Sequence, residues 1–178
     1  FEISLTPSYL SAFTTKWIDD GGVYVIANIR GGGEYGPKWH QSALKANRQK
    51  AYDDFISVAE ELIEKKVTSP RNLGIRGGSN GGLLVGAVIT HRPDLLRVAF
   101  PEVGVMDMLR YEKFTIGHAW AVEYGTAKEE KSFKNLLKYS PIHNVKRNLN
   151  YPSTFIYTAN HDDRVVPAHS FKYAATLQ

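Results

Sequence analysis

The chain has 178 residues, no cysteine and a formal net charge of +4, with 22 Lys and Arg residues against 18 Asp and Glu residues. The lack of cysteine excludes disulfides and cysteine metal sites, and the small positive excess, spread along the chain, does not form the basic stripe of a nucleic-acid-binding protein. No apolar run reaches the ~18 residues of a membrane span. We therefore expect one globular domain with no cofactor, no metal and no nucleic-acid or membrane partner, located in the cytoplasm, or in the periplasm if the protein is bacterial.

The first predicted strand covers residues 22–29, a near-continuous apolar run that is typical of a strand buried on both faces of a parallel sheet. The segment 31–36, GGGEYG, then matches Gly-x-Gly-x-x-Gly, and Asp53 and Asp54 follow about 20 residues later, as in a dinucleotide-binding site. That fingerprint needs a helix that opens at the glycines, whereas residues 37–41 show no helical periodicity. We favour a mobile or tightly turned loop near the active face over nucleotide binding.

Apolar residues at helical spacing predict an amphipathic helix over roughly 48–66. A short strand over 72–76 and an apolar helix over 83–89 follow, and the segment 77–82 between them reads GGSNGG. The order strand, Gly-x-Ser-x-Gly, helix is typical of the nucleophile elbow of α/β-hydrolases. The alternative is a glycine-rich turn capped by a serine.

The elbow gives the glycines and the serine separate tasks. We expect that a side chain at Gly77 or Gly81 would collide with the neighbouring strand or helix. The sharp turn lifts the hydroxyl of Ser79 above the edge of the sheet and directs the first N–H groups of the helix at the reaction centre. Ser79 is therefore the predicted nucleophile.

The second half of the chain continues the alternation of strands and helices. A strand is expected over 97–100, mostly helical or irregular structure rich in aromatic residues over 107–140, a strand over 152–158 and a helix over 168–178. Alternating strands and helices predict an α/β fold with a mostly parallel sheet and helices on both faces.

An activated serine needs a base and a carboxylate that orients the base, in the chain order Ser, Asp or Glu, His for α/β-hydrolases. The last predicted strand is followed by Asp162 and Asp163, where the acid belongs, although Asp is also common at helix starts. Only His169 lies downstream, inside the last predicted helix, where packing or surface exposure suits it better. The other histidines fit the order no better, so we expect the general base to lie outside this chain.

The chain resembles, along nearly its whole length, the catalytic domain of the prolyl oligopeptidase family of serine peptidases. The matching segments, in chain order, are ANIRGGGEYG (27–36), GGSNGG (77–82), VGVMDM (103–108), TIGHAW (115–120) and DDRVVP (162–167). Several independent matches in the right order make this resemblance specific. It implies an α/β-hydrolase fold and a peptidase that acts on short peptides, on the carboxyl side of proline, through an acyl-enzyme.

The resemblance also implies roles for single residues. Ser79 would be the nucleophile, Asn80 would offer its backbone N–H to the oxyanion, and Asp162, the first of the paired aspartates, would orient the histidine. Trp120 would stack on the substrate proline ring, and Arg164 would hydrogen-bond a substrate carbonyl. The apolar proline pocket would be lined by Phe1, Ile116, Tyr124 and Val165. Each aromatic residue taken alone is also explained by core packing.

Three parts of the family pattern are not matched by these residues: an oxyanion tyrosine before Phe1, a histidine after Gln178, and a β-propeller domain. We therefore expect residues 1–178 to be a partial α/β-hydrolase catalytic domain, incomplete at both ends. This stretch would need the rest of its own chain, the propeller and the segment that bears the histidine, and would be nearly inactive by itself.

Two other functions remain open. One is another α/β-hydrolase, such as an acylaminoacyl peptidase or an esterase; the pair Trp120 and Arg164 suits proline recognition and not simple ester hydrolysis. The other is a noncatalytic fragment or a binding pseudoenzyme, for which the missing histidine and tyrosine are the evidence. Such a piece would leave apolar faces of its sheet uncovered, and would associate or aggregate.

Overall fold

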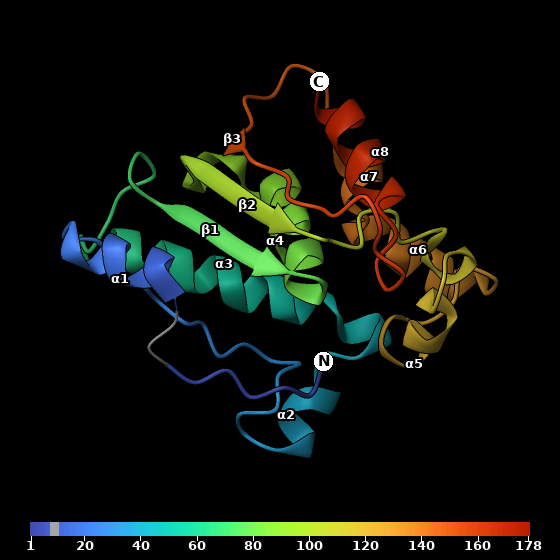
Figure 1. Ribbon diagram of the computed structural model, residues 1–178. Helices are drawn as coiled ribbons and strands as arrows, with labels where there is room; N and C mark the ends of the chain where they lie inside the picture. The colour runs from blue at the N-terminus through green and yellow to red at the C-terminus, as the bar shows by residue number, and fades with distance from the viewer. Residues whose placement is uncertain (8–10) are drawn as a thin grey trace.

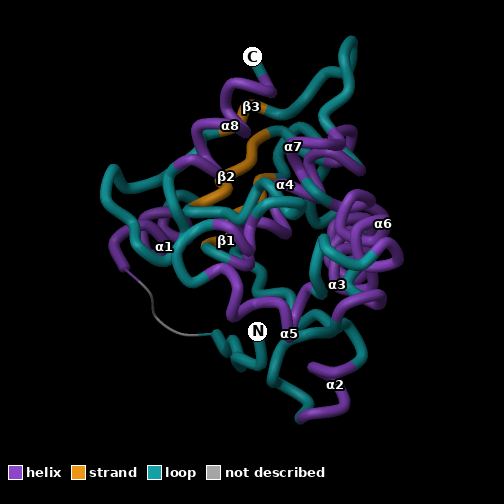
Figure 2. Tube along the Cα trace, turned by 90° about the vertical axis from the view of Figure 1, so that its right-hand side faces the viewer, coloured by secondary structure: helices purple, strands orange, loops and turns teal. Residues whose placement is uncertain are grey.

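The computed structural model describes residues 1–7 and 11–178. The helices and strands, with short 3-10 helices marked η, are α1 (Ser11–Asp19), α2 (Pro37–Gln41), η1 (Lys45–Asn47), α3 (Gln49–Glu64), β1 (Gly74–Gly78), α4 (Asn80–His91), η2 (Pro93–Leu95), β2 (Val98–Glu102), η3 (Tyr111–Lys113), η4 (Gly117–Trp120), α5 (Ala121–Tyr124), α6 (Glu130–Tyr139), α7 (Pro141–Asn144), β3 (Ser153–Thr154) and α8 (Ala168–Leu177). A three-stranded sheet in the order β1-β2-β3 lies at the centre (Figure 1). Figure 2 shows α3 and α4 on one side of the strands and α1 on the other.

The three strands are parallel and in a fixed register. Ile75 lies opposite Ala99, Ala99 lies opposite Thr154, and one further bridge joins Glu102 to Tyr157. Because the strands run in the same direction, their carboxyl ends meet at one edge of the sheet, which is where open α/β sheets bind ligands. The chain segments that follow β1, β2 and β3 therefore all begin at this edge.

Helix α4 forms the centre of the core. Its sequence is apolar on every side, which is typical of a helix that other elements enclose, and Leu83, Val85 and Val88 are fully buried. The helix packs against β1, β2, α3 and α7. Because α4 begins directly after Ser79, this burial also holds one end of the Ser79 turn in place.

Most of the predicted elements are present. The helix expected over 48–66 is α3, the helix expected over 83–89 is the longer α4, and the helix expected over 168–178 is α8. The strands expected over 72–76 and 97–100 are β1 and β2, each displaced slightly along the chain. Short helices fill much of 107–140, as expected.

Three local predictions are wrong. Residues 22–29 form no strand in the described part of the chain, and Val23 and Tyr24 are exposed, because a strand needs a neighbour that satisfies its N–H and C=O groups. Residues 37–41 form the short helix α2, with Pro37 in the first turn, where a missing N–H costs nothing. The strand expected over 152–158 is regular only in β3 and continues as the single bridge at Tyr157.

No helix within residues 1–7 and 11–178 is both long and apolar enough to span a bilayer.

Candidate active site

Ser79 occupies a strained turn between β1 and α4. Its φ of 57° and ψ of −114° are uncommon for a residue with a side chain, and such strain is kept where the surrounding structure over-determines the backbone. Its N–H donates to the carbonyl of Glu102 over 2.9 Å, and its own carbonyl accepts from the N–H of Leu83 over 3.0 Å. The turn is therefore held both by β2 and by the first turn of α4.

The glycines around Ser79 are needed at two places, one of which differs from the prediction. A Cβ on Gly77 would lie 2.5 Å from the carbonyl oxygen of Gly81, so a side chain there collides as expected. A Cβ on Gly81 meets no heavy atom within 4 Å, so the predicted collision at Gly81 is wrong. The crowded position is Gly82, whose Cβ would lie 2.5 Å from the carbonyl oxygen of Glu102, because α4 packs there directly on the backbone of β2.

Asn80 is the first residue of α4, and its backbone N–H is one of the groups that an α-helix leaves without an intrahelical acceptor. Such groups, together with the helix dipole, favour negative charge. The side-chain oxygen of Asn80 accepts from Arg48 Nη2 over 2.5 Å and from the Tyr124 hydroxyl over 2.7 Å. Burial raises the pKa of Tyr124 far above its usual value, so this hydroxyl keeps the proton that it donates.

The predicted proline-pocket aromatics form one group of rings. The ring centre of Phe1 lies 6.5 Å from that of Trp120 and 5.8 Å from that of Tyr124, and Trp120 stacks on Tyr111 at 6.4 Å. Trp120 is only 8% exposed, and Val165 is buried in the same apolar cluster. Ile116 is 42% exposed and does not belong to that cluster.

Asp162 and Asp163 differ in their surroundings. The Oδ1 atom of Asp162 accepts from the N–H groups of Arg164 and Val165, both over 2.9 Å, whereas Asp163 is exposed. The carbonyl of Arg164 accepts from the hydroxyl of Thr115 over 3.1 Å. The loop that carries Asp162 is therefore tied both to its own backbone and to the segment before η4.

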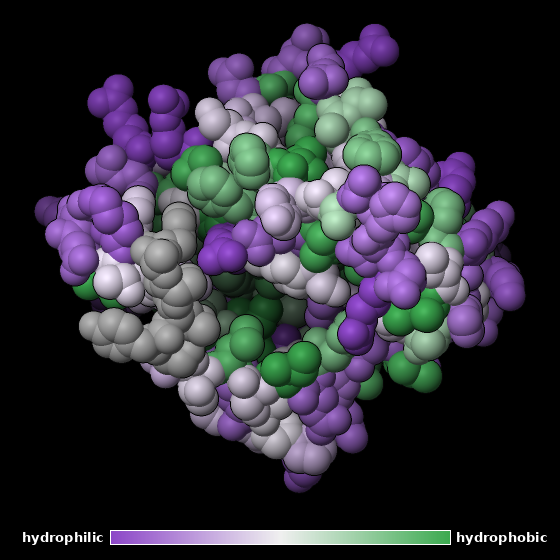
Figure 3. All heavy atoms as spheres, viewed as in Figure 1, coloured by the Kyte–Doolittle hydropathy of each residue, from purple (hydrophilic) through white to green (hydrophobic). Residues whose placement is uncertain are grey.

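Backbone hydrogen bonds connect the Ser79 turn to the segment that leads to Asp162. Ser79 donates to Glu102 at the end of β2, and the next residue, Val103, donates to the carbonyl of Tyr157 over 2.8 Å. The Ser79 turn and the end of the third strand thus lie at the same edge of the sheet. The face seen in Figure 1 is hollowed near its middle, and both apolar and hydrophilic side chains surround the hollow (Figure 3).

Four of the six histidines are occupied by local contacts. His169 is buried, and its Nδ1 accepts from the N–H of Asp107 over 3.1 Å; burial lowers its pKa to about 4. His143 contacts the hydroxyl of Ser140, His91 the carbonyl of Lys138, and His40 the carbonyl of Gly31. His118 and His161 are exposed. Of the two environments expected for His169, packing or surface exposure, the structure has packing.

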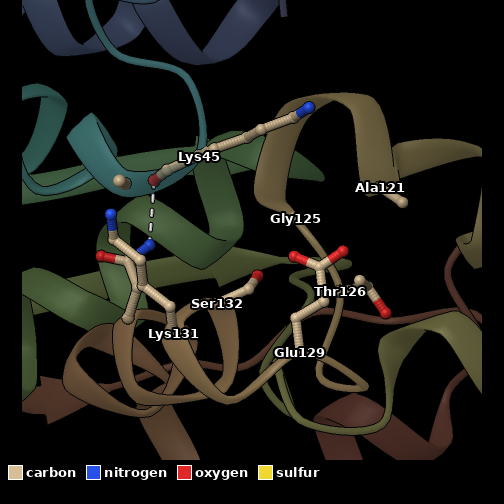
Figure 4. Close-up of a pocket in the computed structure, with 9 residues that line it drawn as sticks. Lys45, Ala121, Gly125, Thr126, Glu129, Lys131 and Ser132 are labelled. Carbon is tan, nitrogen blue, oxygen red and sulfur yellow. Dashed lines mark hydrogen bonds between the residues drawn. The ribbon is translucent and has the colours of Figure 1, made fainter.

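The remaining candidate binding features do not involve the predicted site residues. Asp54, at the spacing of a dinucleotide site, accepts from the backbone N–H and from the guanidinium of Arg30. Within the described residues no group of three His, Asp or Glu side chains is arranged to hold a metal ion. A hollow of about 310 Å³ lies between η1, α5 and α6, with Lys45, Thr126, Glu129 and Ser132 around it (Figure 4), and it includes none of the predicted site residues.

Sequence reasoning did not identify the charged residues behind Asn80. Arg48 is 3% exposed and contacts Asn80, Tyr124 and Glu123, and Glu123 contacts His40. Arg48 lies at the start of a helix whose polar positions all look alike in the sequence, so no local pattern marks it as buried. The packing of η1 against α5 and of α3 against α4 brings these residues together.

The model of the prolyl oligopeptidase family matches residues 8–178. The chain is 54% identical over 179 residues to the prolyl endopeptidase of Elizabethkingia miricola, and the matched region covers 100% of this chain and 25% of that protein. It matches a solved prolyl endopeptidase structure with a TM-score of 0.96 and 51% identity, over 99% of this chain and 26% of that one.

A second solved structure, of a post-proline cleaving enzyme from Rickettsia typhi, matches with a TM-score of 0.95 and 42% identity over 99% of this chain and 26% of that one. The predicted α/β-hydrolase fold is therefore confirmed. The chain spans about a quarter of the length of the curated relatives that it matches.

Proposed function

Because the chain belongs to the prolyl oligopeptidase family, whose members are peptidases, we propose that the whole protein is a serine endopeptidase that cleaves short peptides on the carboxyl side of proline. The observation that carries the proposal is the conformation of Ser79, a strained serine between a parallel strand and the amino end of a buried helix. In the nucleophile elbow this geometry presents the serine hydroxyl beside the free N–H groups of the helix start, which is what acyl transfer needs.

The proposed reaction uses these groups in turn. The Oγ atom of Ser79 attacks the carbonyl carbon of the bond that follows proline, while a histidine oriented by Asp162 takes the hydroxyl proton. The backbone N–H of Asn80 stabilises the negative charge that develops on the carbonyl oxygen. The C–N bond then breaks, the amine leaves with the proton, and water hydrolyses the ester on Ser79.

In this proposal, the group of aromatic rings around Trp120 binds the proline ring of the substrate and gives the enzyme its preference for proline. A flat pyrrolidine ring that stacks on an indole buries apolar area at little cost in conformational entropy. Phe1 packs against both Trp120 and Tyr124, and Val165 belongs to the same apolar cluster as these two rings, which supports a small pocket of this kind. Because Trp120 is only 8% exposed, the proposal requires one face of the indole to open to the substrate.

The general base is proposed to come from a part of the whole protein outside residues 1–178. His169, His143, His91 and His40 are each held by other groups, and exposed His161 precedes the acid in the chain. Loss of a triad member costs about 10⁴ to 10⁶ in rate. Residues 1–178 by themselves should therefore cleave peptides and react with a fluorophosphonate very slowly.

The test uses the protein from its complete gene and compares a proline peptide amide, the same peptide with alanine in place of proline, and a short acyl ester. We expect cleavage after proline, and a loss of at least about 10⁴-fold in Ser79→Ala. Ser153→Ala, an exposed serine of β3, is the matched control and should keep its activity. Retained cleavage in Ser79→Ala would overturn the nucleophile, and equal cleavage of the alanine peptide would overturn the proline preference.

A further inference from the structure

A buried charged cluster lies behind the nucleophile turn and has no part in the reaction described above. The side chain of Arg48, which links η1 to α3, is 4% exposed, and its Nη1 lies 3.6 Å from Oε2 of Glu123. The Oε1 atom of Glu123 lies 3.0 Å from Nε2 of His40. The guanidinium carbon of Arg48 lies 5.1 Å from the centre of the Tyr124 ring. A positively charged side chain is thus buried beside Asn80, the residue that follows Ser79.

Packing and ion pairing alone are a poor explanation for this cluster. Within the described residues, Nε and Nη1 of Arg48 and Oε2 of Glu123 make no hydrogen bond of good geometry, and the hydroxyl of Tyr52, which lies beside the guanidinium, makes none either. Incompletely paired buried charges cost free energy, and apolar residues of similar volume are often as stable in their place. The contact that the guanidinium does make at hydrogen-bond distance, between Nη2 and Oδ1 of Asn80 at 2.5 Å, therefore indicates its purpose.

Arg48 and Tyr124 together fix the amide of Asn80. One carboxamide oxygen accepts both a charged donor and the Tyr124 hydroxyl at 2.7 Å, and a hydrogen bond from a charged donor is shorter and stronger than a neutral one. Two donors from different elements leave the side chain one orientation. Because Asn80 begins α4 directly after the strained Ser79, fixing its side chain also restrains the peptide group that carries its N–H.

The backbone that carries Arg48 is itself anchored. The N–H of Arg48 donates to the carbonyl of Lys45 over 3.0 Å, and the N–H of Ala51 donates to the carbonyl of Arg48 over 3.1 Å. The side chain of Asn135, on α6, also donates to the carbonyl of Lys45 over 2.9 Å, as the dashed line in Figure 4 shows. A guanidinium on such a support can hold Asn80 with little freedom of its own.

We propose that Arg48 is a positioning residue for peptide cleavage, which acts through the carboxamide of Asn80 to hold the backbone N–H of Asn80 against the developing oxyanion. This inference rests on the proposed function, because the oxyanion forms only if Ser79 attacks a peptide carbonyl. Arg48 takes no part in the proposed reaction, and within the described residues it makes no hydrogen bond to Ser79. Its effect must therefore disappear when the Asn80 side chain is removed, and it must be larger on the transition state than on bound substrate.

The experiment measures kcat and KM in the protein from its complete gene for four forms: wild type, Arg48→Met, Asn80→Ala and the double variant. Arg48→Met keeps a similar side-chain volume. It should lower kcat about 10- to 100-fold and change KM less, because small misplacements of catalytic groups have effects of this size on the rate. In the Asn80→Ala background the same substitution should lower kcat by less than about 3-fold, since coupled residues are not additive.

A peptide aldehyde that ends in proline provides a second measurement, since its adduct with Ser79 carries an oxyanion-like oxygen. Arg48→Met should weaken its binding about as much as it lowers kcat/KM, and leave binding of the product peptide nearly unchanged. Equal losses with and without the Asn80 side chain, or equal weakening of aldehyde and product, would show a merely structural role and overturn the proposal. If Arg48→Met does not fold, Arg48→Lys is subjected to the same two tests, and additivity there overturns the proposal equally.

Labelling of Ser79 by a fluorophosphonate separates the two hypotheses. A wild-type protein that is not labelled refutes the serine peptidase itself. A protein that is labelled but does not cleave proline peptides refutes only the proline preference, and the rate of labelling then replaces kcat in the four-form comparison. Labelling and cleavage that are unaffected by Arg48→Met refute only the positioning role.

Discussion

Two adjacent glycines that follow the Ser79 turn, Gly81 and Gly82, should respond in opposite ways to the same methyl group. In Gly82→Ala the new Cβ lies 2.5 Å from the carbonyl oxygen of Glu102 and 2.6 Å from the Cα of Gly104. Both are backbone atoms, so neither can yield as the end of a flexible side chain would. In Gly81→Ala the new Cβ meets no heavy atom within 4 Å.

The expected magnitudes follow from these contacts. Overpacking in a close-packed interior costs about 1–3 kcal/mol, and contact between two backbones belongs at the upper end, so Gly82→Ala should lower the free energy of unfolding by about 3 kcal/mol. Gly81→Ala should raise it by up to about 1 kcal/mol, because alanine favours the helix and restricts the unfolded chain. A shift of α4 away from β2 also displaces Ser79, so its labelling should slow about 10²-fold in Gly82→Ala.

The assay is denaturant unfolding of the protein from its complete gene, followed by the intrinsic fluorescence of this domain, together with the rate of fluorophosphonate labelling. Gly81→Ala is the matched control, since it places the same methyl group one residue away. A Gly82→Ala protein as stable as wild type would refute the reasoning, and so would a Gly81→Ala protein destabilised as much as Gly82→Ala.

Two further predictions concern buried polar side chains. Burial lowers the pKa of His169 from 6.5 to about 4, so on acidification the unfolded chain binds the proton before the folded chain does. The free energy of unfolding should therefore fall by up to about 3 kcal/mol between pH 6.5 and 4. In His169→Asn this pH-dependent loss of stability should be absent, and unfolding midpoints that change with pH as in the wild type would contradict the prediction. Tyr139 is fully buried and its hydroxyl has no partner among the described residues, so Tyr139→Phe should raise the free energy of unfolding by up to about 1 kcal/mol, whereas a loss of more than ~1 kcal/mol in denaturant unfolding would reveal a bond to that hydroxyl.

The elements that the sequence predicted well are those whose signal is local. Helix α3 carries apolar residues at helical spacing, and α4 is apolar throughout and directly follows a strand and a glycine-rich turn. Residues 22–29 have an equally strong apolar pattern yet form no strand, because pairing depends on a neighbouring strand and not on the run itself. The same dependence reduces the strand expected over 152–158 to β3 and one bridge.

The glycines of the elbow show the same limit at the level of single residues. The motif Gly-x-Ser-x-Gly placed the second crowded glycine at Gly81, while the structure places it at Gly82. Which helical position faces β2 depends on the rotation of α4 about its axis. That rotation is decided by packing against β1, β2, α3 and α7, and no motif of six residues records it.

By itself, the sequence determined the parallel α/β fold, the serine turn, the paired aspartates after the last strand and the resemblance to a peptidase family, because these features are written in patterns of a few consecutive residues. Only the tertiary structure decided how Asp162 is bound where Asp163 is not, and how Arg48 and Tyr124 converge on Asn80. The contacts on Asn80 join segments that lie 32 and 44 residues apart along the chain, and the local bonds of Asp162 depend on the conformation that its loop adopts. Their energies depend on burial and on distances of a few ångströms, which exist only once the chain has folded.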